Sequence, residues 1–299
     1  MAELAKNTAN IETIPPEEKF IPPWKEAWRS FCKNRLAVAG LAIVIFFIIL
    51  AIIAPWIAPY GFKDQVMSER MQAPSSKHWF GTDDFGRDIF SRVLYGARIS
   101  LWVGFFSVLG SVVVGTFLGI IAGYYGRWVD AIISRIFDIM LAFPSILLAI
   151  SIVAILGPSL QNALIAIAII NVPNFGRLVR SKVLSVKQEE YIMSAQATGM
   201  KDSRILFQHI LPNSISPVIV QATLAIATAI IEAAALGFLG LGAQPPTPEW
   251  GKMLADSKNY ITTAPWTLFF PGMAIMLTVL GFNLMGDGLR DVLDPKMKN

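Results

Sequence analysis

The chain alternates between long apolar runs and shorter polar segments. Five stretches carry either no charged residue or only one, and they cover residues 36–62, 99–126, 139–176, 213–247 and 259–286. A helix that crosses a bilayer needs about 20 consecutive apolar residues. Each stretch is therefore long enough to cross a membrane at least once.

The run over 139–176 is too long for one span, and Gly157-Pro158 divides it into two. Apolar residues follow one another without alternation, which favours helices over the strands of a membrane barrel. The sequence thus predicts an all-α polytopic membrane protein with about six transmembrane helices. They lie near residues 36–58, 99–124, 132–156, 161–178, 214–241 and 265–287.

Composition supports a multi-pass protein of a membrane. Hydrophobic residues make up 54% of the chain and charged residues 15%, with a mean hydropathy of +0.55. Soluble domains carry about 25% charged residues. The single cysteine, Cys32, has no partner for an intrachain disulfide.

The distribution of lysine and arginine predicts that both termini are cytoplasmic. With the N-terminus inside, 17 of the 25 basic residues lie in inner segments, as the positive-inside rule requires. The pI near 9.2 follows from these spread charges. No basic groove with stacking aromatic residues accompanies them, so we expect no nucleic-acid partner.

The segments divide the chain into a few regions. We predict a cytoplasmic tail with an interfacial helix at 1–35, a first span at 36–58, an outer segment at 59–98, a helical core at 99–290 and a cytoplasmic tail at 291–299. Aromatic and basic residues alternate at helical spacing around Trp28, which suits a helix on the inner headgroups. The alternative is the cytoplasmic start of the first span.

A polar, helix-forming stretch at 189–212 separates two apolar runs. Gly199 is placed to end a first helix in the left-handed conformation. Asp202 is a suitable N-cap for a second helix over 203–210, and Pro212 is expected to stop it. A hairpin between two spans indicates a partner in water, although two short helices in an ordinary loop are an alternative.

Polar and small residues inside the spans indicate packing faces and a wet cavity. Glycines recur along the second span, including Gly110 and Gly119, and favour close helix contact. Glu232 is the only ionisable residue deep in a span, where facing lipid costs roughly 2.5–3.5 kcal/mol. We expect it to face a translocation pathway with Asn171 and Asn174, or to be a protonated structural residue.

The hairpin resembles the signature of binding-protein-dependent ABC importer permeases. That signature is Glu-Ala-Ala, three residues, Gly, nine residues, Ile, one residue, Leu-Pro. The second Ala, the Gly and the Leu-Pro match here at Ala195, Gly199 and Leu211-Pro212. Met193 replaces the Glu, Ser194 replaces the first Ala, and His209 replaces the Ile.

Two further stretches are similar to the same family. Residues 78–101 look like the outer segment of dipeptide and oligopeptide permeases, and residues 239–251 are similar to the loop before their last span. The three stretches occur in consistent order from about Pro22 to Pro295. The resemblance is to the C-type permease of a peptide or nickel importer.

This resemblance implies a type I ABC importer permease fold and a set of partners. The chain would form half of a pathway for dipeptides or oligopeptides, with a second dissimilar permease, two ATPase subunits and an extracellular solute-binding protein. Trp250 would contact that binding protein, or simply anchor the chain at the membrane interface. The residues expected to couple to the ATPase are Met193, Ser194, Ala195, Ala197, Gly199, Leu206, Leu211 and Pro212.

Other functions are less consistent with the residues. No phosphate-binding Gly-x-x-x-x-Gly-Lys loop is present, so ATP and Mg²⁺ are expected in partner subunits. No catalytic or metal-binding motif occurs at membrane depth, so we predict no enzyme activity, no metal site and no cofactor bound by this chain. A nickel or metal-chelate importer and an ion-coupled transporter that uses Glu232 are the remaining alternatives.

Overall fold

The computed structural model describes residues 23–293. Residues 1–22 of the predicted N-terminal region (1–35) and residues 294–299 of the predicted C-terminal tail (291–299) lie outside the described residues. Between residues 23 and 293 the chain is mainly helical and forms no β-strand, which confirms the all-α prediction.

Five helical segments are long and apolar enough to cross a membrane. They are α2 (Arg35–Ile57), α3 (Ile89–Tyr125), α6 (Leu160–Val186), the continuous stretch Asp202–Phe238 that contains α9 (Leu211–Phe238), and α11 (Trp266–Leu293). Helices α4 (Arg127–Leu141) and α5 (Ser145–Leu156) meet at an angle of 95° and together are also long and apolar enough, as a broken span or a re-entrant loop is. Counting that bent pair as one span, the described residues agree with the six predicted spans.

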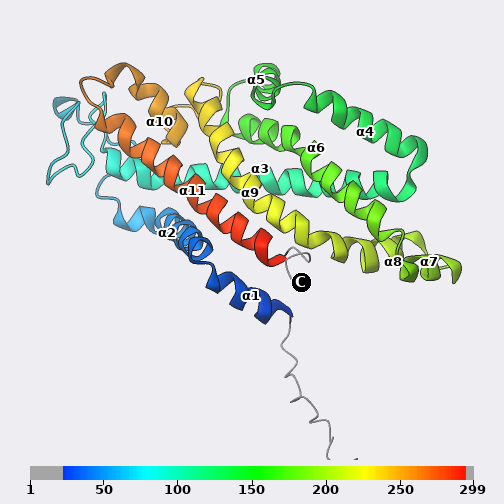
Figure 1. Ribbon diagram of the computed structural model, residues 1–299. Helices are drawn as coiled ribbons and strands as arrows, with labels where there is room; N and C mark the ends of the chain where they lie inside the picture. Colours follow the sequence, from blue (N-terminus) through cyan, green and yellow to red (C-terminus); the bar gives the residue numbers. More distant parts are fainter. Residues whose placement is uncertain (1–22, 294–299) are drawn as a thin grey trace, which may run out of the picture.

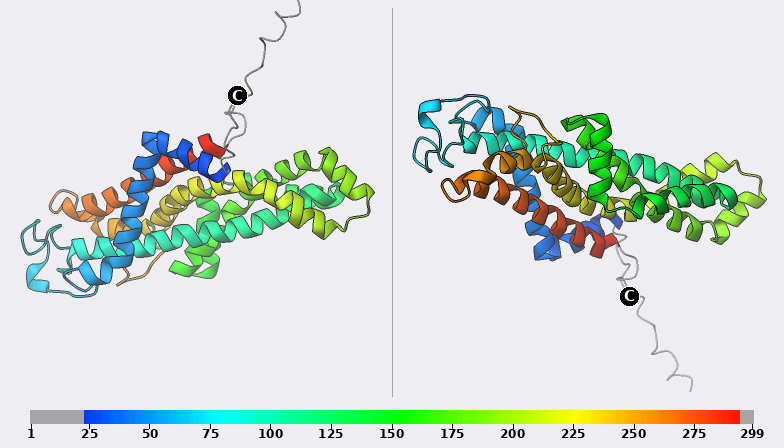
Figure 2. Two further views of the ribbon diagram at one scale, coloured as in Figure 1. Left: turned by 90° about the horizontal axis from the view of Figure 1, so that it is seen from below. Right: turned by 90° about the horizontal axis from the view of Figure 1, so that it is seen from above.

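The remaining helices are short. They are α1 (Pro23–Lys33), the 3-10 turns η1 (Met67–Glu69) and η3 (Lys258–Tyr260), α7 (Glu190–Ala197), α8 (Asp202–Ile205), the π turn η2 (Leu206–Ile210) and α10 (Trp250–Ser257). Helices α7 and α8 lie at one end of the long axis, and α10 lies with the segment before α3 at the other (Figure 1). Two further views show α3 running along most of the molecule's length (Figure 2).

Helix α3 begins ten residues before the predicted start of the second span. The Asp88 carboxylate accepts a hydrogen bond from the Ser91 N–H at 2.8 Å and caps the helix. The Arg92 guanidinium is buried and donates to the Phe62 carbonyl at 3.0 Å. The charged side chains near the start of α3, which made residues 89–98 look like part of an outer loop, thus have hydrogen-bond partners within the folded chain.

Buried charged groups fold the outer segment. The Asp83 carboxylate accepts from the Phe85 and Arg87 N–H groups, both at 2.9 Å, and pairs with the Arg87 guanidinium at 2.6 Å. His78 Nδ1 lies 2.9 Å from Asp88 Oδ1. These acidic side chains close turns within the segment.

The largest helix contact joins α3 to α6, where glycines bring the two backbones together. A Cβ atom built on Gly119 would lie 2.5 Å from the Gly176 carbonyl oxygen, far inside van der Waals contact. A Cβ on Gly110 meets only the Ala168 methyl, at 3.4 Å. The predicted close packing is therefore tight at Gly119 and looser at Gly110.

We predict that Gly119→Ala separates α3 from α6 and destabilises the chain by about 1–3 kcal/mol, as overpacked cores do. Gly110→Ala is the matched control, because its methyl group fits the available space and alanine favours the helix. Thermal unfolding in detergent measures both variants. Equal melting temperatures for the two variants would contradict the close approach.

Candidate functional site

The first helix of the polar hairpin ends at Gly199, as predicted. This residue has φ of +75°, in the left-handed region. The Met200 N–H donates to the Ala195 carbonyl at 3.1 Å, and the Gly199 N–H donates to the Gln196 carbonyl at 3.0 Å. Together these bonds form a Schellman cap, which turns the chain sharply toward α8.

Two expectations for the second half of the hairpin are wrong. Asp202 is the first residue of α8 and caps no backbone group; its carboxylate accepts a 2.6 Å hydrogen bond from the Tyr124 hydroxyl at the end of α3. Pro212 does not stop the helix. The π turn before it shifts the Leu211 N–H to the Leu206 carbonyl, and this wider turn lets the helix continue past the proline.

The hairpin has a buried face that fixes it to the bundle. Ile192, Ile205 and Ile210 are completely buried in the core shared by α3, α6 and α9. Ala195 is also buried, so the expectation that it offers contact surface is corrected. Leu206 and Leu211 are half-buried, and Leu206 packs against the same core.

The opposite face of the hairpin is open. Of the residues predicted to couple to an ATPase, Met193, Ser194, Ala197, Gly199 and Pro212 are exposed. Two aromatic side chains that the sequence interpretation missed join them. Phe207 is 70% exposed and Tyr191 46%, and a large apolar side chain on an otherwise polar helix is the signal that identifies Phe207.

The three predicted pathway residues come together in one cavity. Glu232 Oε2 accepts from Asn171 Nδ2 at 3.1 Å, and Asn174 Nδ2 lies 3.5 Å from Asn171 Oδ1. The cavity has a volume of about 300 Å³ and lies beside Ser145, where α4 and α5 meet. A polar cluster therefore exists at membrane depth; its role in transport stays a prediction.

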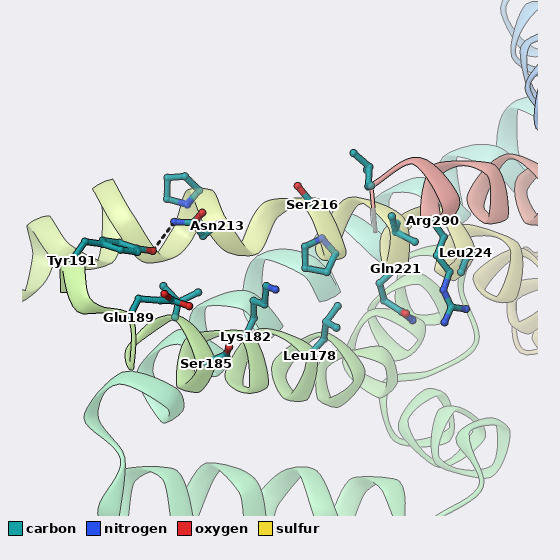
Figure 3. Close-up of a pocket in the computed structure, with 15 residues that line it drawn as sticks. Leu178, Lys182, Ser185, Glu189, Tyr191, Asn213, Ser216, Gln221, Leu224 and Arg290 are labelled. Carbon is teal, nitrogen blue, oxygen red and sulfur yellow. Dashed lines mark hydrogen bonds between the residues drawn. The ribbon is translucent and has the colours of Figure 1, made fainter. Parts of the chain in front are cut away.

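A second cavity of about 800 Å³ opens between α6, α9 and α11, next to the hairpin (Figure 3). Gln221 lines both cavities, so its side chain lies between them. The Tyr191 hydroxyl accepts from Asn213 Nδ2 at 3.3 Å at the hairpin end. The deeper polar cluster is thus separated from the space beside the hairpin by the Gln221 side chain.

Trp250 contradicts both expectations for it. Its indole is completely buried, donates from Nε1 to the Val93 carbonyl at 3.1 Å and packs edge-on against Phe47. A buried side chain offers neither a contact to a binding protein nor an anchor at the membrane surface. Trp250 instead ties α10 to α2 and α3.

Glu249, one residue earlier, caps α10 from a buried position. Its two carboxylate oxygens accept from the Gly251 and Lys252 N–H groups, each at 2.8 Å. Burial raises the pKa of Glu249 to about 7, although the two backbone hydrogen bonds act in the opposite direction.

Comparison with known proteins identifies the family. Residues 115–299 match the model of the binding-protein-dependent transport system inner membrane component, and residues 22–74 match the N-terminal transmembrane domain of oligopeptide transport permease C. The chain belongs to the binding-protein-dependent transport permeases. It is an inner-membrane component of a bacterial ABC transporter, and this family works with ATPase and binding-protein partners.

Several relatives match along nearly the whole chain. The dipeptide transport system permease protein DppC of Alkalihalophilus pseudofirmus is 67% identical over 98% of this chain and 97% of its own length. The glutathione transport system permease protein GsiD of Pectobacterium atrosepticum is 49% identical over 98% of this chain and 99% of its own length.

A solved structure supports the fold. An inward-facing form of the MetNI methionine ABC transporter contains a chain that aligns with a TM-score of 0.55 and 20% identity, over 67% of this chain and 96% of that one. The resemblance found in the sequence and the predicted ABC importer permease fold are confirmed.

We predict that Gly199→Val disrupts the Schellman cap, because a left-handed conformation costs a residue with a Cβ roughly 1–2 kcal/mol. No atom lies within 4 Å of the added Cβ, so the effect is conformational. Asparagine tolerates the left-handed region, and Gly199→Asn is the control. Hydrogen exchange over residues 190–205 should rise in the valine variant only; equal exchange in both variants would refute the cap.

We also predict a pH effect at Glu249. The raised pKa means that the folded chain binds a proton that the unfolded chain releases, so this group's contribution is lost as pH rises from 4.5 through 7. Between pH 4.5 and pH 8, the free energy of unfolding of the parent should fall by about 3 kcal/mol relative to that of Glu249→Gln. The glutamine side chain does not titrate in this range, so the variant shows the stability of the chain without the proton uptake of Glu249. Parallel stability curves from thermal unfolding would contradict the shift.

Proposed function

We propose that the chain is the permease subunit of an ATP-driven importer and forms half of a transmembrane pathway for dipeptides or oligopeptides. The observation that carries this proposal is 67% identity, over 98% of the chain, to a dipeptide permease. The glutathione permeases also match over nearly the full length. These names favour peptides over a nickel or metal-chelate cargo.

The assembly that we propose has four kinds of partner. A second, dissimilar permease completes the pathway, two ATPase subunits bind ATP and Mg²⁺, a solute-binding protein delivers the peptide from outside, and the bilayer surrounds the spans. The chain itself is not an enzyme and holds no cofactor in this proposal. The outer segment at 59–97 and the loop at 243–264 face the binding protein.

The exposed face of the hairpin supports an ATPase-docking role. Met193 and Phe207 present flexible and aromatic apolar surface beside the small residues of α7. Moving a two-state equilibrium from 1:99 to 99:1 requires about 5.5 kcal/mol of differential binding. At about 25 cal/mol per Å² this is roughly 200 Å² of additional apolar burial, an area of the size that a few such side chains provide.

Glu232 has a role in the pathway in this proposal. Its hydrogen bond from Asn171 keeps a carboxyl group in a wet cavity away from lipid, and such groups at membrane depth mark substrate routes. An ion-coupled transporter would also use such a carboxyl group. Dependence of uptake on ATP separates the two functions.

The test is uptake of a radiolabelled dipeptide into proteoliposomes that hold the complete transporter, with binding protein outside and ATP inside. We expect ATP-dependent uptake, reduced about tenfold by Phe207→Ala because an aromatic anchor at an interface is worth more than 1 kcal/mol. Phe117→Ala is the control, since Phe117 of α3 is a phenylalanine that is 63% exposed and lies in neither the hairpin nor the segments that face the binding protein. Uptake without ATP, or unchanged uptake by Phe207→Ala, would count against this proposal.

A further inference from the structure

A tyrosine at the hairpin end of α3 holds the second half of the hairpin. Tyr124 is buried, and its hydroxyl donates a 2.6 Å hydrogen bond to Asp202 Oδ1. A contact of this length between a hydroxyl and a carboxylate is a strong, charge-assisted hydrogen bond. Asp202 is the first residue of α8, and the helix continues from there through the π turn into α9. One side-chain bond therefore joins the start of that long helix to the end of α3.

The same tyrosine contacts the segment that leads into the hairpin. Lys187 ends α6 and donates from Nζ to the Tyr124 carbonyl at 2.7 Å. Its ammonium nitrogen also lies 5.4 Å from the centre of the Tyr124 ring, which is within the range of cation–π attraction. The chain is thus held to Tyr124 on both sides of α7, at Lys187 before this helix and at Asp202 after it.

Apolar contacts hold the hairpin without fixing its direction. Ile192 of α7 and Ile205 of α8 are completely buried in the core cluster that also contains Tyr124. Hydrophobic burial is non-directional, so these side chains permit small shifts of the hairpin over the bundle. A hydrogen bond, in contrast, weakens steeply when its angle changes. The bond from Tyr124 to Asp202 therefore sets the position of α8 relative to α3.

Helices α3 and α6 respond to a displacement as one body. A Cβ atom built on Gly115 would lie 2.8 Å from an α6 carbonyl oxygen, and one built on Gly123 would lie 2.8 Å from an α6 side chain. Together with Gly119, successive turns of α3 thus lie against α6 with no room for a methyl group. Packing of this density transmits strain. A movement passed to Tyr124 therefore reaches both helices, and α6 carries Asn171 of the polar cluster.

We propose that Tyr124 is a positioning residue, and that its hydrogen bond to Asp202 passes displacement of the hairpin to α3 and α6. A partner that docks on the exposed face pushes α7 and α8 as a pair. With the bond in place, α8 and the end of α3 move together, so Asn171 on α6 and Glu232 on α9 shift in step. Without the bond, α8 slides over the end of α3, and part of the displacement is lost before it reaches the bundle. This inference rests on the proposed function and adds to it the contact through which the hairpin moves the other helices.

The experiment uses the complete transporter in proteoliposomes, with the binding protein and a radiolabelled dipeptide outside and ATP inside. The measured quantity is the number of ATP molecules hydrolysed for each dipeptide imported. Tyr124→Phe removes only the hydroxyl group, and we expect it to raise this ratio about tenfold, the change in a two-state equilibrium that one hydrogen bond to a charged group gives. Tyr125→Phe is the matched control, because the adjacent Tyr125 is 52% exposed and its hydroxyl makes no hydrogen bond within residues 23–293. Its ratio should equal that of the parent.

A second variant tests the bond itself. Asp202→Ala should also raise the ratio, and the double variant Tyr124→Phe/Asp202→Ala should raise it no further than Asp202→Ala alone, because both substitutions remove the same bond. Independent effects of the two substitutions overturn the inference, and so does an unchanged ratio in Tyr124→Phe. Hydrolysis and uptake that fall in parallel leave the ratio unchanged and give the tyrosine a purely structural role. Absence of ATP-dependent uptake in the parent contradicts the proposed function instead, so the two failures are distinguishable.

Discussion

The close approach of α3 and α6 is the contact on which the rest of the bundle depends. Because Gly119 lies against the Gly176 backbone, α3 and α6 meet at that point without a side chain between their backbones. Lipid provides no hydrophobic drive to bring helices together, so dense packing of this kind supplies much of the attraction. Helix α9 then packs on both, and the polar cluster around Glu232 forms where α6 and α9 face each other.

Around this pair, the chain places its charges where they are satisfied locally. Ion pairs join the bent segment to α6, with Arg180 Nη2 2.7 Å from Asp130 Oδ2 and Arg177 paired with Asp138. The outer segment closes its acidic residues on Arg87 and His78. Lys182 and Arg290 differ, because each enters a cavity without a counter-ion among the described residues.

Hydropathy predicted the existence of the spans better than their ends. For α2, which has few charges at its borders, the predicted and observed bounds differ by one residue. Helix α3 begins before its predicted start and helix α6 ends after its predicted end. The length of an apolar run reflects the thickness of the membrane, whereas the length of the helix depends on how far its backbone hydrogen bonds continue. The prediction that Pro212 ends its helix was wrong because it considered the proline alone. A proline removes one backbone hydrogen bond, and the π turn before Pro212 compensates for that loss.

The candidate site was predictable only where a single residue carries its own energetic signal. Glu232 stood out because a charge in lipid is costly, and Gly199 because few residues tolerate positive φ. Trp250 is ambiguous in the sequence, since burial and interfacial anchoring use the same aromatic side chain. The presence of Lys182 and Arg290 in one cavity depends on how α6 and α11 are arranged, and local sequence patterns contain no information on that arrangement.

The passage of one uninterrupted helix from α8 through the π turn into α9 has a mechanical consequence. Phe207 and Glu232 lie 25 residues apart along this helix, about 38 Å at 1.5 Å per residue. The π turn and Pro217 are features at which helices bend, and both lie nearer to Phe207 than to Glu232. A displacement at Phe207 is therefore partly taken up by bending close to the wet end, and the turns beyond Pro217 carry the remainder to the carboxyl group as a change of direction.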